Sequence, residues 1–380
     1  MRLAVIRQRY TPFGGAERFL DSALQALLDR GVAVTLYTRE WRAPHASRIE
    51  PRIVDPFHIG GWWRDAGFAR AVCRALAKDD AALVQSHERL TCCDVFRAGD
   101  GVHAAWLDER RRHLSPLEAF SLRFNPHHRY RLDVERRMYA NPRLRAIICN
   151  SQMVRDEIRD RFGVADDRLH VIYNAVDTSL FTPAVRAQRA DVRQRHRIAG
   201  NALVYVLVGS GFERKGVATA LDALARTDAP AHLIVVGKDR HLDRYRERAR
   251  ALGIAERVTL TGPVDDPRPY YGAGDAFVLP SLYDPCPNAA LEAMACGLPI
   301  ITSTRSGAAE LAHAADAGLV CPPGDPHALA VHMQTLSDTR VRERMGAQAR
   351  AAMLPLTPSA MVSQLLALYD RLLAPRRGPS

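Results

Sequence analysis

Two carboxylates stand eight residues apart in the stretch "SLYDPCPNAALEAMACGLPIITS" (281–303). Asp284 lies in a proline-rich loop, and Glu292 lies about one turn into a short alanine-rich helix that we expect Asn288 to cap and Gly297 to end. A carboxylate accepts two hydrogen bonds side by side, which suits the vicinal hydroxyls of a ribose or a hexose. The alternative is that Glu292 is only a favourable charge near a helix N-terminus, worth a few tenths of a kcal/mol.

The amides at the start of this helix are further candidates, because unsatisfied N–H groups there can receive a phosphate or a sugar oxygen. The amides in question belong to Asn288, Ala289 and Ala290.

A second stretch, "VLVGSGFERKGVATAL" (206–221), combines glycines with two cations. A strand is expected to run into Gly209, and Arg214 and Lys215 would then stand at a helix start. Cations at a helix N-terminus oppose the helix dipole and cost about 0.3 to 1 kcal/mol each. A bound diphosphate would reverse the sign of that term, so the pair indicates an anion site; a solvated basic pair is the alternative.

Gly14 and Gly15 follow the first expected strand and open a helix expected over 14–31. Paired glycines let a backbone approach a phosphate or a sugar closely, although the same pair also serves in an ordinary tight turn.

The elements that must position these residues alternate between short apolar runs and helical patterns. Continuous apolar runs are typical of parallel strands buried on both faces, so the pattern predicts an α/β protein with two doubly wound sheets. The expected strands are 3–6, 32–38, 82–86, 94–98, 145–150, 169–174, 202–209, 232–237, 257–262, 276–280, 299–303 and 318–323. The apolar pattern lapses over 174–202, which places the domain boundary near residue 178, and a last helix over 359–375 is expected to return to the first domain.

The composition fits two soluble domains, with 380 residues, 47% hydrophobic and 25% charged. No signal-peptide pattern or run of about 18 apolar residues is present, so we expect a cytoplasmic or peripheral protein. The seven cysteines lie mostly in apolar segments and are expected to be buried and reduced, and the Cys92–Cys93 pair has no second pair with which to hold a metal.

The formal net charge of +11 implies an anionic partner. Ten arginines against five acids fall within 103–145, among them Arg110, Arg111, Arg112 and Arg123. Leucines and aromatics are interleaved with these arginines, as in a helix that lies on an anionic membrane. Phosphorylated sugars would also suit the segment, and an ordinary solvated helical insertion is the alternative.

Together these motifs resemble the retaining glycosyltransferases of family 4, which have the GT-B fold of two Rossmann-like domains facing across a cleft. The resemblance rests on "VIYNAVDTSLFTP" at the domain junction, "VGSGFERKG", "YYGAGDAFVLPSLYDPCPNAALEAMACGLPIITS" and "GLVCPPGDPHALA". It implies an acceptor domain over 1–177 that includes the basic segment 103–145, a donor domain over 178–357, and a C-terminal helix within 358–380.

The resemblance also implies roles for single residues. Arg214 and Lys215 would bind the donor diphosphate, with Gly14, Gly15 and Gly209 close by, and Glu292 would hold the donor ribose. The first acid of the family's E-x₇-E motif is here Asp284, one methylene shorter, and amides from Pro287 to Ala290 are expected to take over part of its role near the donor hexose.

Within the family the chain is similar to bacterial lipopolysaccharide core glucosyltransferases. That similarity places Asp100 at the acceptor, with His103 and His87 as alternatives. It implies transfer of a hexosyl group from a UDP-sugar, with no metal or other cofactor, to a lipid-linked glycan at the inner face of the bacterial inner membrane. No nucleophile stands out, which suits a front-face mechanism in which the leaving diphosphate helps to deprotonate the acceptor.

Two other classes of function remain open. A sugar-nucleotide epimerase on the same scaffold would need no acceptor, and a non-catalytic nucleotide-sugar-binding protein would tolerate the shortened Asp284. No nucleic-acid motif or stacking platform is present, so nucleic acid is not expected as a partner.

Overall fold

The computed structural model describes residues 2–10, 24, 27–41, 49–227 and 230–374. The chain divides into two units, and we describe each by itself. The first comprises Met1–Asn174 with Pro358–Ser380, and the second comprises Ala175–Thr357.

The first unit contains a seven-stranded sheet in which every pairing is parallel, in the order β5-β3-β1-β6-β7-β8-β9. Its strands are β1 (Arg2–Ile6), β3 (Ala33–Thr38), β5 (Glu50–Ile53), β6 (Leu83–Ser86), β7 (Val95–Ala98), β8 (Ala146–Cys149) and β9 (Leu169–Val171). A separate parallel pair is formed by β2 (Arg9–Tyr10) and β4 (Glu40–Trp41). Strand β5 was not expected, because it is short, largely exposed and contains Pro51, as only an edge strand can.

The second unit contains a six-stranded parallel sheet in the order β12-β11-β10-β13-β14-β15. Its strands are β10 (Leu203–Val208), β11 (Ala231–Val236), β12 (Val258–Gly262), β13 (Ala276–Leu279), β14 (Ile300–Ser303) and β15 (Gly318–Cys321). The two doubly wound parallel sheets expected from the apolar runs are therefore confirmed.

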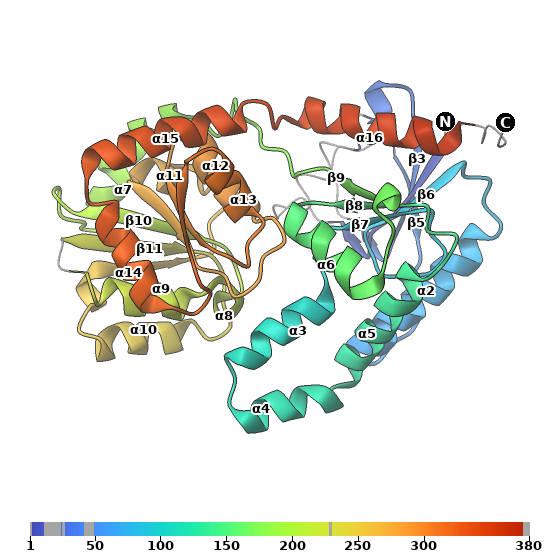
Figure 1. The fold of residues 1–380 in the computed structure, drawn as a ribbon, viewed down its shortest axis with the longest axis horizontal. Helices are drawn as coiled ribbons and strands as arrows, with labels where there is room; N and C mark the ends of the chain where they lie inside the picture. The colour runs from blue at the N-terminus through green and yellow to red at the C-terminus, as the bar shows by residue number, and fades with distance from the viewer. Residues whose placement is uncertain (1, 11–23, 25–26, 42–48, 228–229, 375–380) are drawn as a thin grey trace. The chain divides into compact units, whose positions relative to one another are not determined.

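Helices lie on both faces of each sheet (Figure 1). Those of the first unit include α2 (Gly61–Leu76), α3 (His103–Arg112), α4 (Pro116–Ser121), α5 (Pro126–Tyr139), α6 (Gln152–Phe162) and α16 (Pro358–Leu373), with the 3₁₀ turn η1 (Leu122–Phe124). Those of the second unit include α7 (Arg189–Arg195), α8 (Phe212–Lys215), α9 (Val217–Leu224), α10 (Leu242–Ala251), α11 (Arg268–Ala273), α12 (Asn288–Ala295), α13 (Ala308–Ala314), α14 (Pro326–Thr335) and α15 (Thr339–Met353). Most of the helix expected over 14–31 lies outside the described residues, but Leu24, Leu27 and Leu28 are buried.

Asp275 fixes the start of β13 against the start of β10. Its backbone N–H donates to the Val204 carbonyl at 2.7 Å, and its carboxylate accepts from the Val204 N–H at 2.8 Å. Arg189 and Arg193 hold the same carboxylate at 2.6 and 2.7 Å. Burial acts to raise the pKa of Asp275, but these donors outweigh it and lower the pKa, so the group stays ionised and holds the two central strands in register.

The cysteines differ from expectation. Cys73 on α2 and Cys92 form a disulfide, and the five others are free and buried. The expectation of seven reduced thiols is therefore wrong in this structure. Packing of α2 beside the loop after β6 brings the two Cα atoms to 5.7 Å, within bonding range, which a separation of 19 residues does not reveal.

No single helix of the described chain is both long and apolar enough to cross a membrane, although the bent pair α15 and α16 meets that test jointly.

Gly216 separates α8 from α9 at a φ of +73°, and a Cβ at this position would lie 2.1 Å from the Pro280 carbonyl oxygen. We expect Gly216→Ala to lower the free energy of unfolding by about 1 to 3 kcal/mol, because both the backbone angle and the contact with another backbone resist it. Urea unfolding monitors the change. Gly200→Ala is the matched control, since a Cβ there meets open space, and equal losses in the two variants would contradict the steric argument.

Candidate active site

The carboxyl ends of the neighbouring strands β10 and β13 bring together the predicted cations and the predicted loop acid. Lys215 Nζ lies 2.5 Å from Asp284 Oδ2, and Arg214 Nη1 lies 3.4 Å from the same oxygen. Arg214 also donates to the Tyr283 carbonyl at 3.3 Å. Backbone hydrogen bonds from Asp284 to Arg305 and from Gly307 to Asp284 hold the acid against the loop after β14. One carboxylate is therefore shared by two cations.

Arg214 and Lys215 directly precede a helix start, as expected, because Gly216 is the N-cap of α9. They are also the last two residues of the four-residue helix α8, which is bounded by Gly211 and Gly216, both in the left-handed region. The dipole of α8 favours cations at its C-terminus, whereas that of α9 opposes cations at its N-terminus. The short helix α8 and its glycine breaks were not expected from the sequence.

The electrostatics of this cluster favour an anion. Lys215 is 8% exposed, and burial lowers its pKa, with Arg214 adding to the effect and Asp284 opposing it. Burial acts to raise the pKa of Asp284, but attraction to Lys215 and Arg214 outweighs it and lowers the pKa. Two cations against one carboxylate leave a net positive charge at the edge of the sheet.

Gly209 makes room for the buried lysine. A Cβ at Gly209 would lie 2.9 Å from Lys215 Cε, closer than carbon atoms approach. The glycine therefore lets the lysine stem pass under the loop to reach Asp284.

Glu292 is buried on α12, where its Oε2 accepts a hydrogen bond from the Tyr271 hydroxyl at 2.8 Å. Tyr271 was missed at the sequence level, although it lies in the quoted "YYGAGDAFVLP" stretch, because a tyrosine in a short helix reads as core. The hydrogen bond orients the carboxylate of Glu292.

The start of α12 differs from expectation. Asn288 is the first helical residue and not the N-cap, a position that Pro287 occupies. The Ala290 N–H donates to the Pro287 carbonyl at 3.0 Å and is not free, whereas the Ala289 N–H has no partner within the described residues. The tight proline-led turn uses one of the three expected amides itself.

In the first unit, Asp100 is exposed on the turn after β7. His103 opens α3, is 7% exposed, and its Nε2 lies 3.1 Å from Nδ1 of His128. Burial, with the nearby Arg89 and Arg131, lowers the pKa of His103 to about 2. Burial, with Arg97 and Arg7, also holds the pKa of His87 well below its usual value. Both histidines are therefore neutral at pH 7.

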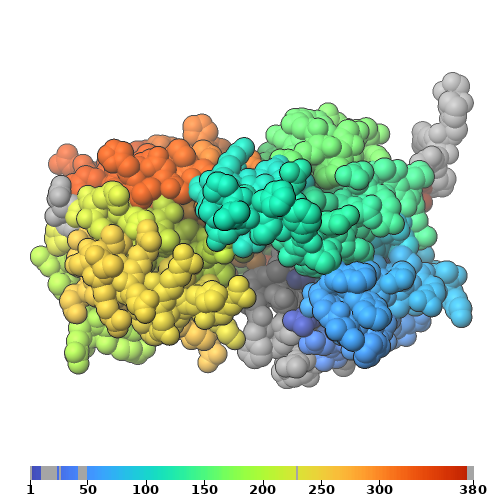
Figure 2. Space-filling view, turned by 90° about the horizontal axis from the view of Figure 1, so that it is seen from below, coloured from blue at the N-terminus to red at the C-terminus, as the bar shows by residue number. Residues whose placement is uncertain are grey.

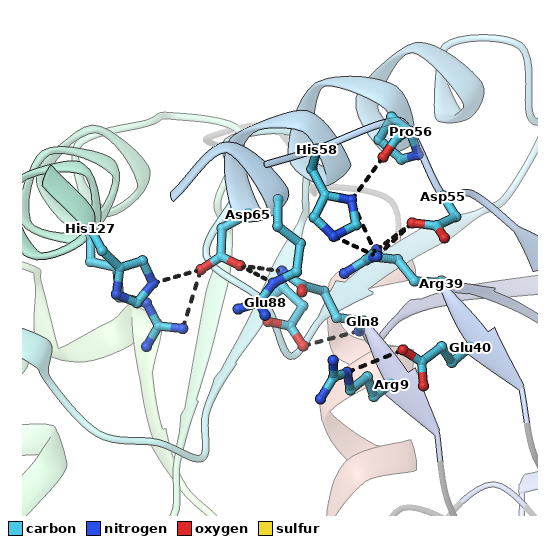
Figure 3. Close-up of polar contacts among 12 residues, drawn as sticks. Gln8, Arg9, Arg39, Glu40, Asp55, Pro56, His58, Asp65, Glu88 and His127 are labelled. Carbon is cyan, nitrogen blue, oxygen red and sulfur yellow. Dashed lines mark hydrogen bonds and ion pairs between the residues drawn. The ribbon is translucent and has the colours of Figure 1, made fainter. Parts of the chain in front are cut away.

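A polar cluster beside these residues was not predicted from the sequence (Figure 3). Asp65 on α2 accepts from Gln8 at 3.2 Å, contacts His127 at 3.1 Å and Arg131 at 3.4 Å. Glu88, which follows β6, accepts from the Gln8 backbone N–H at 3.1 Å. Its position directly after His87 at a strand end was the signal that could have found it.

A cavity of about 10 Å³, the size of one water molecule, lies within this cluster. Burial raises the pKa of Glu88, while Arg7 opposes the shift. The cluster joins the loops after β1 and β6 to α2 and α5.

The four arginines singled out in the basic segment all lie on α3 or η1. Arg110 and Arg111 are half-buried, whereas Arg112 and Arg123 are exposed. They belong to the first unit, whereas Lys215 and Asp284 belong to the second, and Gly14 and Gly15 lie outside the described residues. Among the described residues, no three histidine, cysteine, aspartate or glutamate side chains gather as a metal site would require.

The paired parallel sheets and the strand-end residues define the class of GT-B glycosyltransferases. The family model described as "Glycosyltransferase Family 4" matches residues 13–180, and that described as "Glycosyl transferases group 1" matches residues 188–352. A probable transglycosylase from Burkholderia thailandensis is 32% identical over 96% of this chain and 95% of its own length. The chain belongs to glycosyltransferase family 4 and is a nucleotide-sugar-dependent glycosyltransferase.

Other relatives share most of the chain. The lipopolysaccharide core biosynthesis glycosyltransferase LpsE from Rhizobium meliloti is 28% identical over 87% of this chain and 88% of its own. The crystal structure of WaaG, a glycosyltransferase involved in lipopolysaccharide biosynthesis, has a TM-score of 0.83 at 21% identity and covers 96% and 99% of the two chains. HepE from Anabaena, solved with UDP-glucose, has a TM-score of 0.73 at 20% identity over 98% and 100%. The GT-B fold is thereby confirmed.

We expect Asp284→Asn to lower the free energy of unfolding by about 3 kcal/mol, because Lys215 would be left buried without a counter-charge. Added pyrophosphate should recover part of that loss by supplying the missing negative charge. Urea unfolding with and without pyrophosphate measures both effects. Asp243→Asn, an exposed carboxylate paired with Arg246, serves as control and should unfold like the parent protein. Unchanged stability in Asp284→Asn would contradict the role assigned to this carboxylate.

Proposed function

We propose that the protein is a retaining hexosyltransferase that moves a hexosyl group, glucose or a related hexose, from a UDP-sugar to a lipopolysaccharide core or another cell-surface glycan. The observation that carries the proposal is the pair of cations, Arg214 and Lys215, gathered on Asp284 at the carboxyl ends of β10 and β13. Family membership supports the reaction class, and the UDP-glucose complex of HepE supports the donor.

In the proposed donor complex, the diphosphate takes the place of Asp284 as the partner of the two cations. Arg214 is about two-fifths exposed and can turn toward a ligand, whereas Lys215 is held almost buried. As the bond from the sugar to the diphosphate breaks, negative charge grows on the leaving group, and the two cations stabilise it. Glu292, oriented by Tyr271, receives the ribose hydroxyls.

The shorter acid at position 284 has a consequence in this scheme. Although the side chain is one methylene shorter than glutamate, Asp284 still contacts Lys215 at 2.5 Å. Asp284 therefore serves first as the counter-ion that keeps Lys215 charged while no donor is bound. Ala289, whose N–H has no partner within the described residues, is the amide best placed to assist a donor oxygen.

On the acceptor side we assign Asp100 to the acceptor hydroxyl and His103 to its orientation. Asp100 is exposed, and no fixed partner competes for it in the hydrogen bonds of the described residues. His103, kept neutral by burial and the neighbouring cations, acts as a hydrogen-bonding group and not as a cation. The first unit would then bind the acceptor and the second the donor, with a front-face transfer that uses the leaving diphosphate as base and needs no metal.

The acceptor class rests on the relatives. LpsE acts in lipopolysaccharide core biosynthesis by its name, which supports a core sugar as acceptor. The Burkholderia relative is a probable transglycosylase, which supports the wider class of cell-surface glycans.

We further propose that the first unit rests on an anionic membrane at the cytoplasmic side of the inner membrane. Leu117, Phe120 and Phe124 on α4 and η1 are 83%, 57% and 63% exposed, next to the exposed Arg123. Apolar side chains flanked by arginines suit the boundary between headgroups and acyl chains.

A second exposed apolar group supports the same surface. It consists of Phe57, Ile59, Trp62 and Trp63 at the start of α2. A Cβ on Gly61 would lie 3.7 Å from the His127 ring, so the start of α2 adjoins the start of α5, directly after η1. Figure 2 shows a face of the first unit on which the segments around α2 (blue) and around α3 and α4 (teal) are both exposed. The two groups thus offer a broad surface to one membrane.

A thermal-shift comparison with UDP, GDP, ADP and CMP tests the donor. A ligand at about 100 times its dissociation constant adds about 2.7 kcal/mol to the free energy of unfolding, so UDP should raise the midpoint of thermal unfolding and the other nucleotides should not.

We expect Glu292→Ala to weaken UDP binding at least tenfold, because the ribose hydroxyls lose the carboxylate that binds them. Asp100→Ala is the matched variant and should bind UDP as the parent does while losing transfer. Equal UDP affinity in Glu292→Ala and the parent protein would refute the ribose assignment.

Vesicle sedimentation tests the membrane surface. We expect the full chain to bind vesicles rich in phosphatidylglycerol, and the triple variant Leu117→Ser, Phe120→Ser, Phe124→Ser to bind at least tenfold more weakly. The control replaces three apolar residues of the second unit with serine, namely Leu180, Val331 and Leu354, which are 50%, 51% and 51% exposed. Equal loss of binding in both triple variants would contradict a specific membrane face.

A further inference from the structure

A hollow of about 420 Å³ lies in the first unit where the end of α16 meets the starts of β8 and β9. Its lining includes three arginines, Arg145, Arg168 and Arg371, and a single acid, Asp167, together with apolar groups of Leu144 and Leu372. The lining therefore carries two more positive than negative charges. A space of this volume accommodates a small ligand such as a phosphorylated sugar.

None of the three guanidinium groups forms an ion pair with a carboxylate among the described residues. Arg145 Nη2 donates to the Leu372 carbonyl, and Arg168 Nη2 donates to the Leu144 carbonyl. By contrast, the buried Arg89 of the same unit is matched by an acid, Glu135, at 2.8 Å. The hollow therefore keeps a net positive charge, with Asp167 as the acid in its lining.

Capping of α16 explains only part of this arrangement. A cation near the last carbonyls of a helix is favourable, which accounts for the bond from Arg145 to Leu372. It does not account for Arg168, whose Nε is buried with no hydrogen-bond partner among the described residues. A buried, unsatisfied donor is unfavourable, and a hydrogen bond from this nitrogen to an anion in the hollow would remove that cost.

The hollow shares no residue with those assigned to the donor, and within the first unit it lies apart from those assigned to the acceptor. Asp100 and His87 follow the carboxyl ends of β7 and β6, whereas Arg145 precedes β8 and Arg168 precedes β9. In a parallel sheet, residues that follow the strands and residues that precede them lie at opposite ends of the strands. The positive potential also reaches His170 on β9, since burial and then Arg371 lower the pKa of that histidine.

We propose that this hollow binds the phosphate group of a ligand, with Arg168 and Arg371 as its principal donors and Arg145 beside them. Guanidinium groups match phosphate oxygens in pairs, and three of them around one space suit a monoester or a diester phosphate. A soluble phosphorylated sugar and a lipid headgroup share this chemistry. The site is independent of the UDP-sugar site.

Two probes distinguish the sources of phosphate, and both use the full chain. Isothermal titration with inorganic phosphate, in the presence of saturating UDP to occupy the donor site, reports a soluble ligand. Co-sedimentation with phosphatidylglycerol vesicles, compared with phosphatidylcholine vesicles, reports a headgroup. The test variant is Arg168→Gln, Arg371→Gln, and the control is Arg159→Gln on α6, an exposed arginine paired with Asp160.

We expect the double variant to lose at least tenfold in affinity for one of the two probes, whereas Arg159→Gln behaves as the parent protein. Loss with inorganic phosphate assigns a soluble ligand, and loss confined to anionic vesicles assigns a headgroup. Equal affinities of the parent and double variant for both probes would overturn the proposal. Arg371→Gln alone, which alters an exposed side chain, repeats the comparison if the double variant unfolds. UDP binding, measured in parallel, should not change in any variant, so failure here is distinguishable from failure of the proposed transferase.

Discussion

The rest of the second unit's site depends on the contact of one carboxylate, that of Asp284, with both Lys215 and Arg214. A buried ammonium and a guanidinium can stand side by side only if a negative charge offsets their repulsion, and Asp284 supplies it from the neighbouring strand. The surrounding backbone serves that contact: Gly209 clears the path of the lysine stem, and Gly216 lets the short helix α8 stop against Pro280. A donor diphosphate would carry more negative charge than one carboxylate, so the same cluster is stable when empty and favours an anion when one arrives.

In the first unit, the acids are paired with cations and the histidines are neutral. Its acids at the sheet edge are already engaged, Asp65 by Gln8, His127 and Arg131, and Glu135 by Arg89. Burial and these same cations keep His103 and His128 below their usual pKa, so the histidines hydrogen-bond to each other as neutral rings. Neutral histidines next to an exposed acid, Asp100, suit a sugar hydroxyl better than they suit a phosphate. These contacts agree with the proposal that the first unit binds the acceptor and the second unit binds the donor.

Much of the positive charge behind the net charge of +11 is concentrated in two places. Part of it lies on α3, α5 and η1 beside exposed leucine and phenylalanine side chains, and part lies around the hollow formed by Arg145, Arg168 and Arg371. Both groups of arginines are in the first unit, and neither includes a residue assigned to the donor. Arg214 and Lys215 supply only two of the positive charges of the chain, and Asp284 offsets one of them.

The sequence alone determined the twelve main strands, the two parallel sheets, the family and the pair of cations, because apolar runs, glycines and charges are local features read along the chain. It did not reveal β2, β4 and β5, since strands of only two to four residues are too short to carry an apolar run. Only the tertiary structure decided that Lys215 meets Asp284 across 69 residues, that Tyr271 holds Glu292, that His103 meets His128, and that Cys73 bonds Cys92. It also decided that the cations end the short helix α8 immediately before α9 begins. Each of these pairings depends on which strands and helices become neighbours, and neighbours in a doubly wound sheet are set by crossover connections that no short window of sequence contains.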